Sequence, residues 1–434
     1  MQLELHSEGV FVEGRIAEFA AEAAHDAPGA TRRLHADLVA SGGPLVERVE
    51  GDERVRVTFV WIGPQTDVSV RAQVFDDPLA LSHPMRRVEG TDVWWRQALV
   101  APAVVTTYQY LVDDPFRGVD PTDLAAVGAV LGALRERSFA DPVNPRSLFP
   151  QTAVIAGETT AGSRHRESVL RLPGAEPEPW FDTVPERRGT LTEHRLRDRT
   201  IEVWSPPGAH GALPLVVLLD GECWPLVAEL DGALDALVGS GELAPALVAF
   251  VHNTGGMAAR TAELSCDDSF AAFLAHECVP FLRARHDTTP DRVVIGGDSL
   301  AGLAAAHAAL NHPEVFGAVL SCSGSFWWGY RADDSGWGRD GEPEWLTRQI
   351  AARPPRDVEF WASVGSLETG ASPLSPGVDQ RAANRHLRDV LRAGGCAVTL
   401  VEEPGGHDFA TFRRSAVRGL RALLPPDPEV RPCR

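Results

Sequence analysis

The chain has 434 residues, 44% of them hydrophobic, so we expect two domains, each with its own core. Its net charge of −19 argues against nucleic acid and anionic membranes as partners, because both require a basic surface. The six cysteines lack the spacing of a zinc ribbon or a disulfide framework, and neither a signal peptide nor a membrane-spanning run is recognisable, so we expect a cytoplasmic protein.

The first part of the chain, residues 1–150, predicts a small β-rich domain. One or two helices rich in Ala and Leu are expected over 16–41. Short alternating segments then follow at the spacing of an antiparallel β-sandwich of immunoglobulin-like type; they cover 54–63, 68–75, 92–100 and 104–112. Residues 151–188 contain many Pro and Glu residues with little periodicity, and we expect them to be a linker.

The second part, residues 189–434, alternates between strands and helices. A hairpin is expected over 190–208. Short buried strands separated by helical segments follow at 213–220, 244–252, 292–297, 317–324, 358–365 and 397–405. This alternation predicts an α/β fold, with a mainly parallel sheet covered on both faces.

A candidate nucleophile lies where one of these strands meets a helix. The segment GGDSLAGL (296–303) resembles the G-x-S-x-G signature of α/β hydrolases, in which a serine occupies a strained strand-to-helix turn. Ser299 would be that serine, although Ala301 replaces the last glycine. The alternative is an ordinary turn in which the serine caps the helix.

The segments after two later strands supply partners for Ser299 in the order that this fold uses, namely serine, acid, histidine. Glu368 follows the strand 358–365, and His407 follows the strand 397–405. A serine needs a general base oriented by an acid, and strand ends at this edge of the sheet converge. Asp379 and Asp408 compete with Glu368 for the role of acid.

The tetrahedral intermediate of such a reaction needs two backbone N–H donors. One donor is expected from Leu300, at the start of the helix after Ser299. The other is expected from Glu222, in the loop after strand 213–220, with Cys223 as the competitor.

Several segments together make the chain similar to the enterochelin (enterobactin) esterases, of the esterase D type of α/β hydrolase. They are LLDGECW, RTAEL, GGDSLAGL, NHPEVFGAVLSCSGSFWW and GGHDF, with VTFVWIG, RVEGTDVWWRQALV, YQYLVDD and ADPVNPRSL in the N-terminal part. The resemblance implies a serine hydrolase that cuts the ester bonds of a catecholate siderophore trilactone and releases iron in the cytoplasm. It implies Ser299 as nucleophile, His407 as base and Glu368 as acid.

The resemblance also sets the expected ligands. The enzyme should need no metal or organic cofactor, because iron arrives only as part of the siderophore. A ferric tris-catecholate is an aromatic trianion, which suits arginines and aromatic rings. The candidates for substrate contact are Arg260, Trp224, Arg331 and Trp328. Core packing is the alternative role for Trp328, and an ion pair with Glu263 is the alternative role for Arg260.

Two positions depart from the family pattern. Ala301 stands where the family usually has glycine, and Asp298 stands where it often has glutamine. A carboxylate beside the nucleophile would oppose an anionic substrate unless it points away or is paired. Two other functions therefore remain open, a different esterase D activity on a carbohydrate or aryl ester, and a protein that binds a siderophore without cleaving it.

Overall fold

The computed structural model describes residues 12–75, 80–120, 123–155, 157, 166–182, 188–208, 210–329, 342–372 and 375–426. The chain forms two compact units, one comprising 1–148 and 162–175, the other 149–161 and 176–434. Within the described residues, no helix has the length and apolar character needed to cross a bilayer.

The segment 151–188, which we expected to be a linker, contributes to both units. It contains α3 (Gln151–Ile155) and α4 (Pro179–Asp182) of the second unit, with β10 (Glu167–Arg171) of the first unit between them. The strand β10 pairs with β7, and its central residues 168–170 are buried. A strand that pairs on both sides, with β7 and β9, therefore lies where composition favoured an irregular connection.

The first unit contains two antiparallel sheets, in the orders β1-β2-β6-β5 and β4-β3-β7-β10-β9, with β8 beside β7. Their elements are α1 (Arg15–Ser41), β1 (Leu45–Arg48), β2 (Val55–Ile62), β3 (Val68–Ala72), β4 (His83–Pro84), β5 (Arg86–Arg87), β6 (Val93–Val100), β7 (Val105–Val112), α2 (Leu124–Arg137), β8 (Ser138–Phe139), β9 (Ser147–Leu148) and β10.

Alternation along β2 gives the first sheet two different faces. Phe59 contacts the ring of Tyr108 on β7 of the second sheet. Its neighbour Val60 packs instead with Ile16 and Phe19 of α1. The strand therefore has side chains against the second sheet on one face and against a helix on the other.

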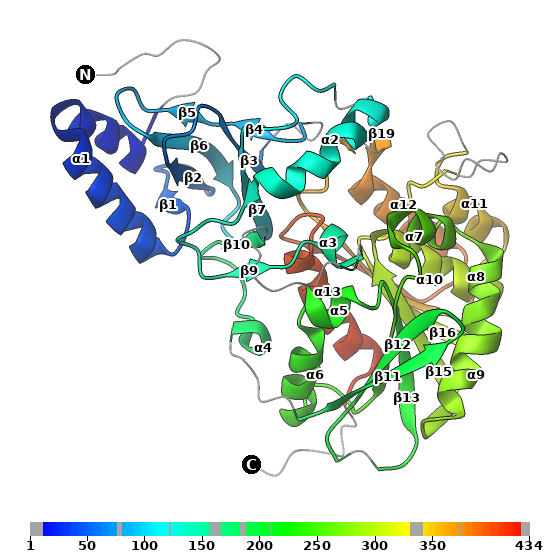
Figure 1. Ribbon diagram of the computed structural model, residues 1–434. Helices are drawn as coiled ribbons and strands as arrows, with labels where there is room; N and C mark the ends of the chain where they lie inside the picture. The colour runs from blue at the N-terminus through cyan, green and yellow to red at the C-terminus, as the bar shows by residue number, and fades with distance from the viewer. Residues whose placement is uncertain are drawn as a thin grey trace. The chain divides into compact units, whose positions relative to one another are not determined.

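The second unit contains one sheet of eight strands, in the order β11-β12-β14-β13-β15-β16-β17-β20. Five of these strands are labelled in Figure 1: β11, β12, β13, β15 and β16. The strands are β11 (Thr190–Leu196), β12 (Arg199–Ser205), β13 (Leu213–Leu219), β14 (Leu247–Val251), β15 (Thr288–Asp298), β16 (Phe316–Cys322), β17 (Glu359–Gly365) and β20 (Val398–Glu403). The first three strands in this order pair antiparallel, and the rest pair parallel. The expected hairpin and mainly parallel sheet are both present.

Helices cover both faces of this sheet. They are α5 (Cys223–Leu226), α6 (Leu230–Gly239), α7 (Gly256–Leu264), α8 (Asp268–Phe273), the π-helix η1 (Leu274–Cys278), α9 (Val279–Arg283), α10 (Ser299–Asn311), α11 (Trp345–Ala352), α12 (Gln380–Ala393) and α13 (Phe409–Leu423); a short hairpin, β18 (Ala371–Ser372) and β19 (Ser375–Asp379), precedes α12. On β16, Val319 packs in the core cluster that includes α10, and Leu320 lies against Gly419 of α13. Because neighbouring strand residues point to opposite faces, α10 and α13 lie on opposite sides of the sheet.

Candidate active site

Ser299 occupies a strained turn between β15 and α10. Its φ angle is 52°, in the left-handed region that serine rarely adopts. Such strain is typical of a nucleophile elbow, because the sharp turn raises the hydroxyl above the end of the sheet. The geometry favours this role over an ordinary helix cap.

Small residues make the turn possible. A Cβ atom at Gly297 would lie 2.5 Å from the Cβ of Ala301, and one at Gly302 would lie 2.6 Å from the Oγ of Ser321. The absence of a side chain at Gly297 therefore leaves the space that the methyl group of Ala301 occupies. This packing explains why alanine is accommodated at a position where the signature has glycine.

The structure brings Ser299, His407 and Glu368 into one chain of hydrogen bonds. The Oγ of Ser299 lies 3.0 Å from Nε2 of His407, and Nδ1 of His407 lies 2.6 Å from Oε2 of Glu368. The carboxylate accepts at Nδ1, so Nδ1 carries the proton and Nε2 is left to accept the serine proton. The Oγ of Ser325 lies 3.2 Å from the Oγ of Ser299, and the two hydroxyl groups share a hydrogen bond.

Glu368 is held firmly for the role of acid. Its side chain is 2% exposed, and its Oε1 accepts hydrogen bonds from the Oγ of Ser323 and the N–H of Gly365, both at 2.6 Å. The competing carboxylates have other partners, since Asp379 accepts from the first turn of α12 and Asp408 from that of α13. They are helix N-caps.

The charges around His407 favour its protonated form. Desolvation opposes protonation, but the charge and hydrogen bond of Glu368, with smaller effects of Asp298 and Asp408, raise the pKa of His407 above its ordinary value. This environment stabilises the imidazolium that forms when the histidine takes a proton from serine.

The predicted oxyanion donors are the backbone N–H groups of Leu300 and Glu222. Leu300 lies in the first turn of α10, where helix N–H groups have no partner within the helix. Among the described residues, the Glu222 N–H has no hydrogen-bond acceptor, whereas the Cys223 N–H donates to the carbonyl of Asp220 at 2.9 Å. The structure thus favours Glu222 over its competitor.

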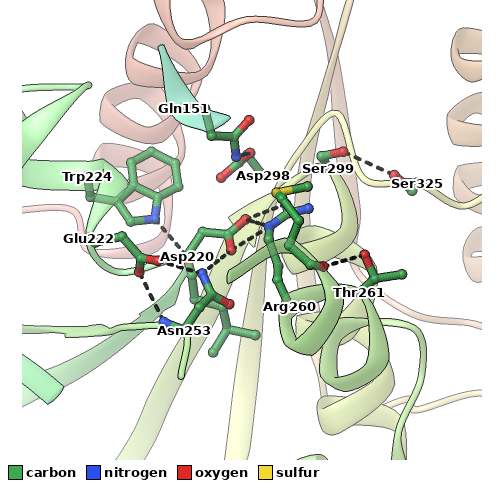
Figure 2. A network of polar contacts seen from close by, with 12 residues as sticks. Gln151, Asp220, Glu222, Trp224, Asn253, Arg260, Thr261, Asp298, Ser299 and Ser325 are labelled. Atoms are coloured by element: carbon green, nitrogen blue, oxygen red, sulfur yellow. Dashed lines mark hydrogen bonds and ion pairs between the residues drawn. The ribbon is translucent and has the colours of Figure 1, made fainter. Parts of the chain in front are cut away.

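Two of the residues expected to contact substrate, Arg260 and Trp224, are buried. Arg260 is 5% exposed, and its guanidinium forms a bidentate ion pair with Asp220, with contacts of 2.5–2.9 Å (Figure 2). Trp224 is fully buried, and its Nε1 donates to the carbonyl of Leu219. Both belong to the interior, because a buried charge and a buried indole N–H each need an internal partner.

The other two candidates for substrate contact are Trp328 and Arg331. Trp328 is 5% exposed and packs in the core cluster of the sheet, with its ring 6.1 Å from that of Trp345. Core packing is therefore its role. Arg331 lies outside the described residues.

Asp298 does not oppose an anionic substrate from the surface, because its side chain is fully buried. Its Oδ2 accepts a hydrogen bond from Nε2 of Gln151 on α3, at 3.0 Å. Burial and the neighbouring Asp220 raise the pKa of Asp298 to about 7, although Arg260 and His407 act in the opposite direction. Sequence reasoning missed Gln151, which lies 147 residues from its partner.

Within the described residues, no group of three or more His, Cys, Asp or Glu side chains is arranged to hold a metal ion. The site described above supplies a serine, a histidine, a carboxylate and backbone donors. Together they can transfer an acyl group from an ester to serine and then to water.

The chain is similar to known esterases along most of its length. The family described as putative esterase matches residues 193–423, and the N-terminal domain family of enterochelin esterase matches residues 56–181. An iron(III) enterobactin esterase of Escherichia coli O6:H1 is 30% identical over 88% of this chain and 94% of that protein. An iron(III) salmochelin esterase of the same organism is 28% identical over 88% of this chain and 90% of that protein.

Solved structures extend the similarity to the fold. A ferric enterobactin esterase from Salmonella typhimurium superposes with a TM-score of 0.72 at 27% identity, covering 90% of this chain and 98% of that one. An enterobactin esterase from Shigella flexneri, determined in the presence of enterobactin, has a TM-score of 0.69 at 26% identity, covering 88% and 96%. The chain therefore belongs to the enterochelin esterase family and is a carboxylic ester hydrolase.

Proposed function

We propose that this protein hydrolyses the ester bonds of a catecholate siderophore trilactone of the enterobactin type and so releases iron in the cytoplasm. The hydrogen-bonded chain of Ser299, His407 and Glu368 carries the proposal. The substrate class is supported by the relatives, which are named as esterases of iron(III) enterobactin and iron(III) salmochelin and match nearly the whole chain.

The reaction begins with attack of Oγ of Ser299 on an ester carbonyl carbon. Nε2 of His407 accepts the serine proton, and the N–H groups of Leu300 and Glu222 stabilise the oxyanion. As the intermediate collapses, the imidazolium gives its proton to the leaving alkoxide, which departs as the free hydroxyl of a serine unit. Water then attacks the acyl-enzyme with His407 again as base, and release of the carboxylic acid restores Ser299.

The buried carboxylate of Glu368 stabilises the imidazolium in both halves of this cycle. Its three hydrogen bonds hold the carboxylate charge in place, so little reorganisation is needed when His407 becomes charged. The protein needs no cofactor for these steps, and iron takes part only as a component of the substrate.

We also infer that the N-terminal unit is an immunoglobulin-like sandwich. The ring contacts of Phe59 with Tyr108 and of Trp61 with Tyr110 support this, since they join β2 of one sheet to β7 of the other. The match of residues 56–181 to the enterochelin esterase N-terminal family is a second support.

The test is incubation of ferric enterobactin with the wild-type protein and with Ser299→Ala, followed by chromatography of the products. We expect the wild type to yield linear and monomeric catechoyl serine products and the variant to yield none above the uncatalysed rate. A wild type that leaves the trilactone intact but cleaves a simple aryl or carbohydrate ester would overturn the substrate. A wild type that binds the siderophore and does not react with a fluorophosphonate would overturn catalysis itself.

A further inference from the structure

The carboxyl group of Asp298, next to the nucleophile, is not used by the mechanism above. It ends β15 and is fully buried. Gln151 donates to its Oδ2, and within the described part of the chain Oδ1 has no hydrogen-bond partner. A buried carboxyl with an unsatisfied oxygen is costly, so its presence beside Ser299 calls for a functional explanation.

Asp298 faces titratable and charged groups from several elements of the second unit. They are Asp220 after β13, Cys223 on α5, Arg260 on α7, Cys322 at the end of β16 and His407 after β20. Figure 2 shows Asp298 between Gln151 and the turn of Ser299, with the ion pair of Asp220 and Arg260 nearby.

Because Arg260 pairs with Asp220, the negative charge of Asp298 has the weaker compensation by positive charge. Arg260 already makes three contacts to the carboxylate of Asp220, whereas no cation is within hydrogen-bonding distance of Asp298 in the described residues. The other positive charge that acts on Asp298 is the imidazolium of His407, which exists only while that ring is protonated.

This inference rests on the serine esterase chemistry proposed above. We propose that Asp298 is a positioning residue that acts through His407, its buried carboxylate being held by Gln151 and stabilising the imidazolium that forms as Ser299 loses its proton. Glu368 holds the ring directly at Nδ1, and Asp298 adds a second negative charge from the side of the nucleophile turn.

Near neutral pH the charges of Asp298 and His407 affect each other's pKa. Burial and the Asp220 charge raise the pKa of Asp298 to about 7, and the Asp298 charge in turn contributes to the raised pKa of His407. Protonation of Asp298 removes its support for the imidazolium. The hydrogen bond from Gln151 favours the ionised carboxylate, so loss of Gln151 should mimic, in part, the loss of the charge.

The test measures the rate at which a fluorophosphonate modifies Ser299 between about pH 5 and about pH 9, a range that spans the titration of His407. Wild type is compared with Asp298→Asn, Gln151→Leu and the double variant. Asp389→Asn is the control, because it removes the same charge from the exposed surface of α12, where solvent screens it.

For Asp298→Asn we expect the acid limb of the profile to move to lower pH by about 1 unit and the plateau rate to fall by up to about tenfold. Gln151→Leu should move the limb in the same direction by less, and it should have no further effect in the Asp298→Asn background. The control should follow the wild-type profile.

The outcomes separate this proposal from the function on which it rests. A folded Asp298→Asn whose plateau falls while its acid limb stays in place would show a purely structural role and overturn the proposal. Equal limb shifts by Gln151→Leu in the presence and absence of Asp298 would also overturn it. Absence of labelling in the wild type would instead contradict the serine esterase function.

Discussion

Arg260→Leu distinguishes a structural role for this arginine from the substrate contact that its position in the sequence indicates. Its side chain is 6% exposed, and that of its partner Asp220 is fully buried. Burial disfavours the charge of Arg260, but the Asp220 carboxylate raises the pKa of the guanidinium above its ordinary value. After the substitution, Asp220 would keep its hydrogen bond from Asn253 and lose its counter-charge.

Removal of one partner from a buried ion pair typically costs about 3–5 kcal/mol, because the other charge is left in a medium that solvates it poorly. We expect the free energy of unfolding of Arg260→Leu to fall by about this amount, which corresponds to roughly 6–20 °C in melting temperature for a domain of this size. The double variant Arg260→Leu/Asp220→Asn should recover most of the loss, since it removes both charges and leaves an amide oxygen for Asn253.

The assay is thermal and urea unfolding of wild type, each single variant and the double variant, with the KM for ferric enterobactin measured on the folded fraction. If Arg260→Leu melts at the wild-type temperature while its KM rises about tenfold, the structural role of Arg260 is wrong. Arg260 would then be a ligand for the anionic substrate, and the buried ion pair would contribute little to stability.

Three further results follow from the site. Glu368→Gln should lower kcat about 10³–10⁴-fold, because an amide cannot hold the His407 tautomer or stabilise its imidazolium; stopped-flow turnover measures this, and a loss below tenfold would exclude Glu368 as the acid. Ser323→Ala should lower kcat by about tenfold through loss of a hydrogen bond to the Glu368 carboxylate; an unchanged kcat would contradict this. The pKa of Asp298 is raised from 3.8 to about 7 in the folded protein, so the folded state holds its proton more tightly than the unfolded chain. This proton binding stabilises the folded state at low pH, and the stabilisation is lost as the pH rises through about 7. Asp298→Asn should therefore gain stability over wild type between pH 4 and pH 8, by on the order of 4 kcal/mol, in unfolding titrations; a pH-independent difference would show that Asp298 is ionised in the folded protein.

Local patterns predicted the parts of the fold that depend on neighbouring residues. The alternation of strands and helices after residue 189 predicted a mainly parallel sheet, and the small residues around Ser299 predicted a tight turn. The acid was harder to assign, because three carboxylates follow late strands. The structure separates them, since Asp379 and Asp408 cap helices and Glu368 reaches His407.

The amino-acid sequence alone predicts the order of serine, acid and histidine, because each lies in a short segment at a strand end whose conformation depends on adjacent residues. The packing of distant segments determines which arginine and tryptophan side chains are buried and which groups surround Asp298. Arg260 meets Asp220 from 40 residues away, and Gln151 reaches Asp298 from 147 residues away. Such contacts depend on how distant segments pack. The local sequence around a charged or aromatic residue is the same whether its side chain faces a ligand or an internal partner, so the sequence pattern does not distinguish the two roles.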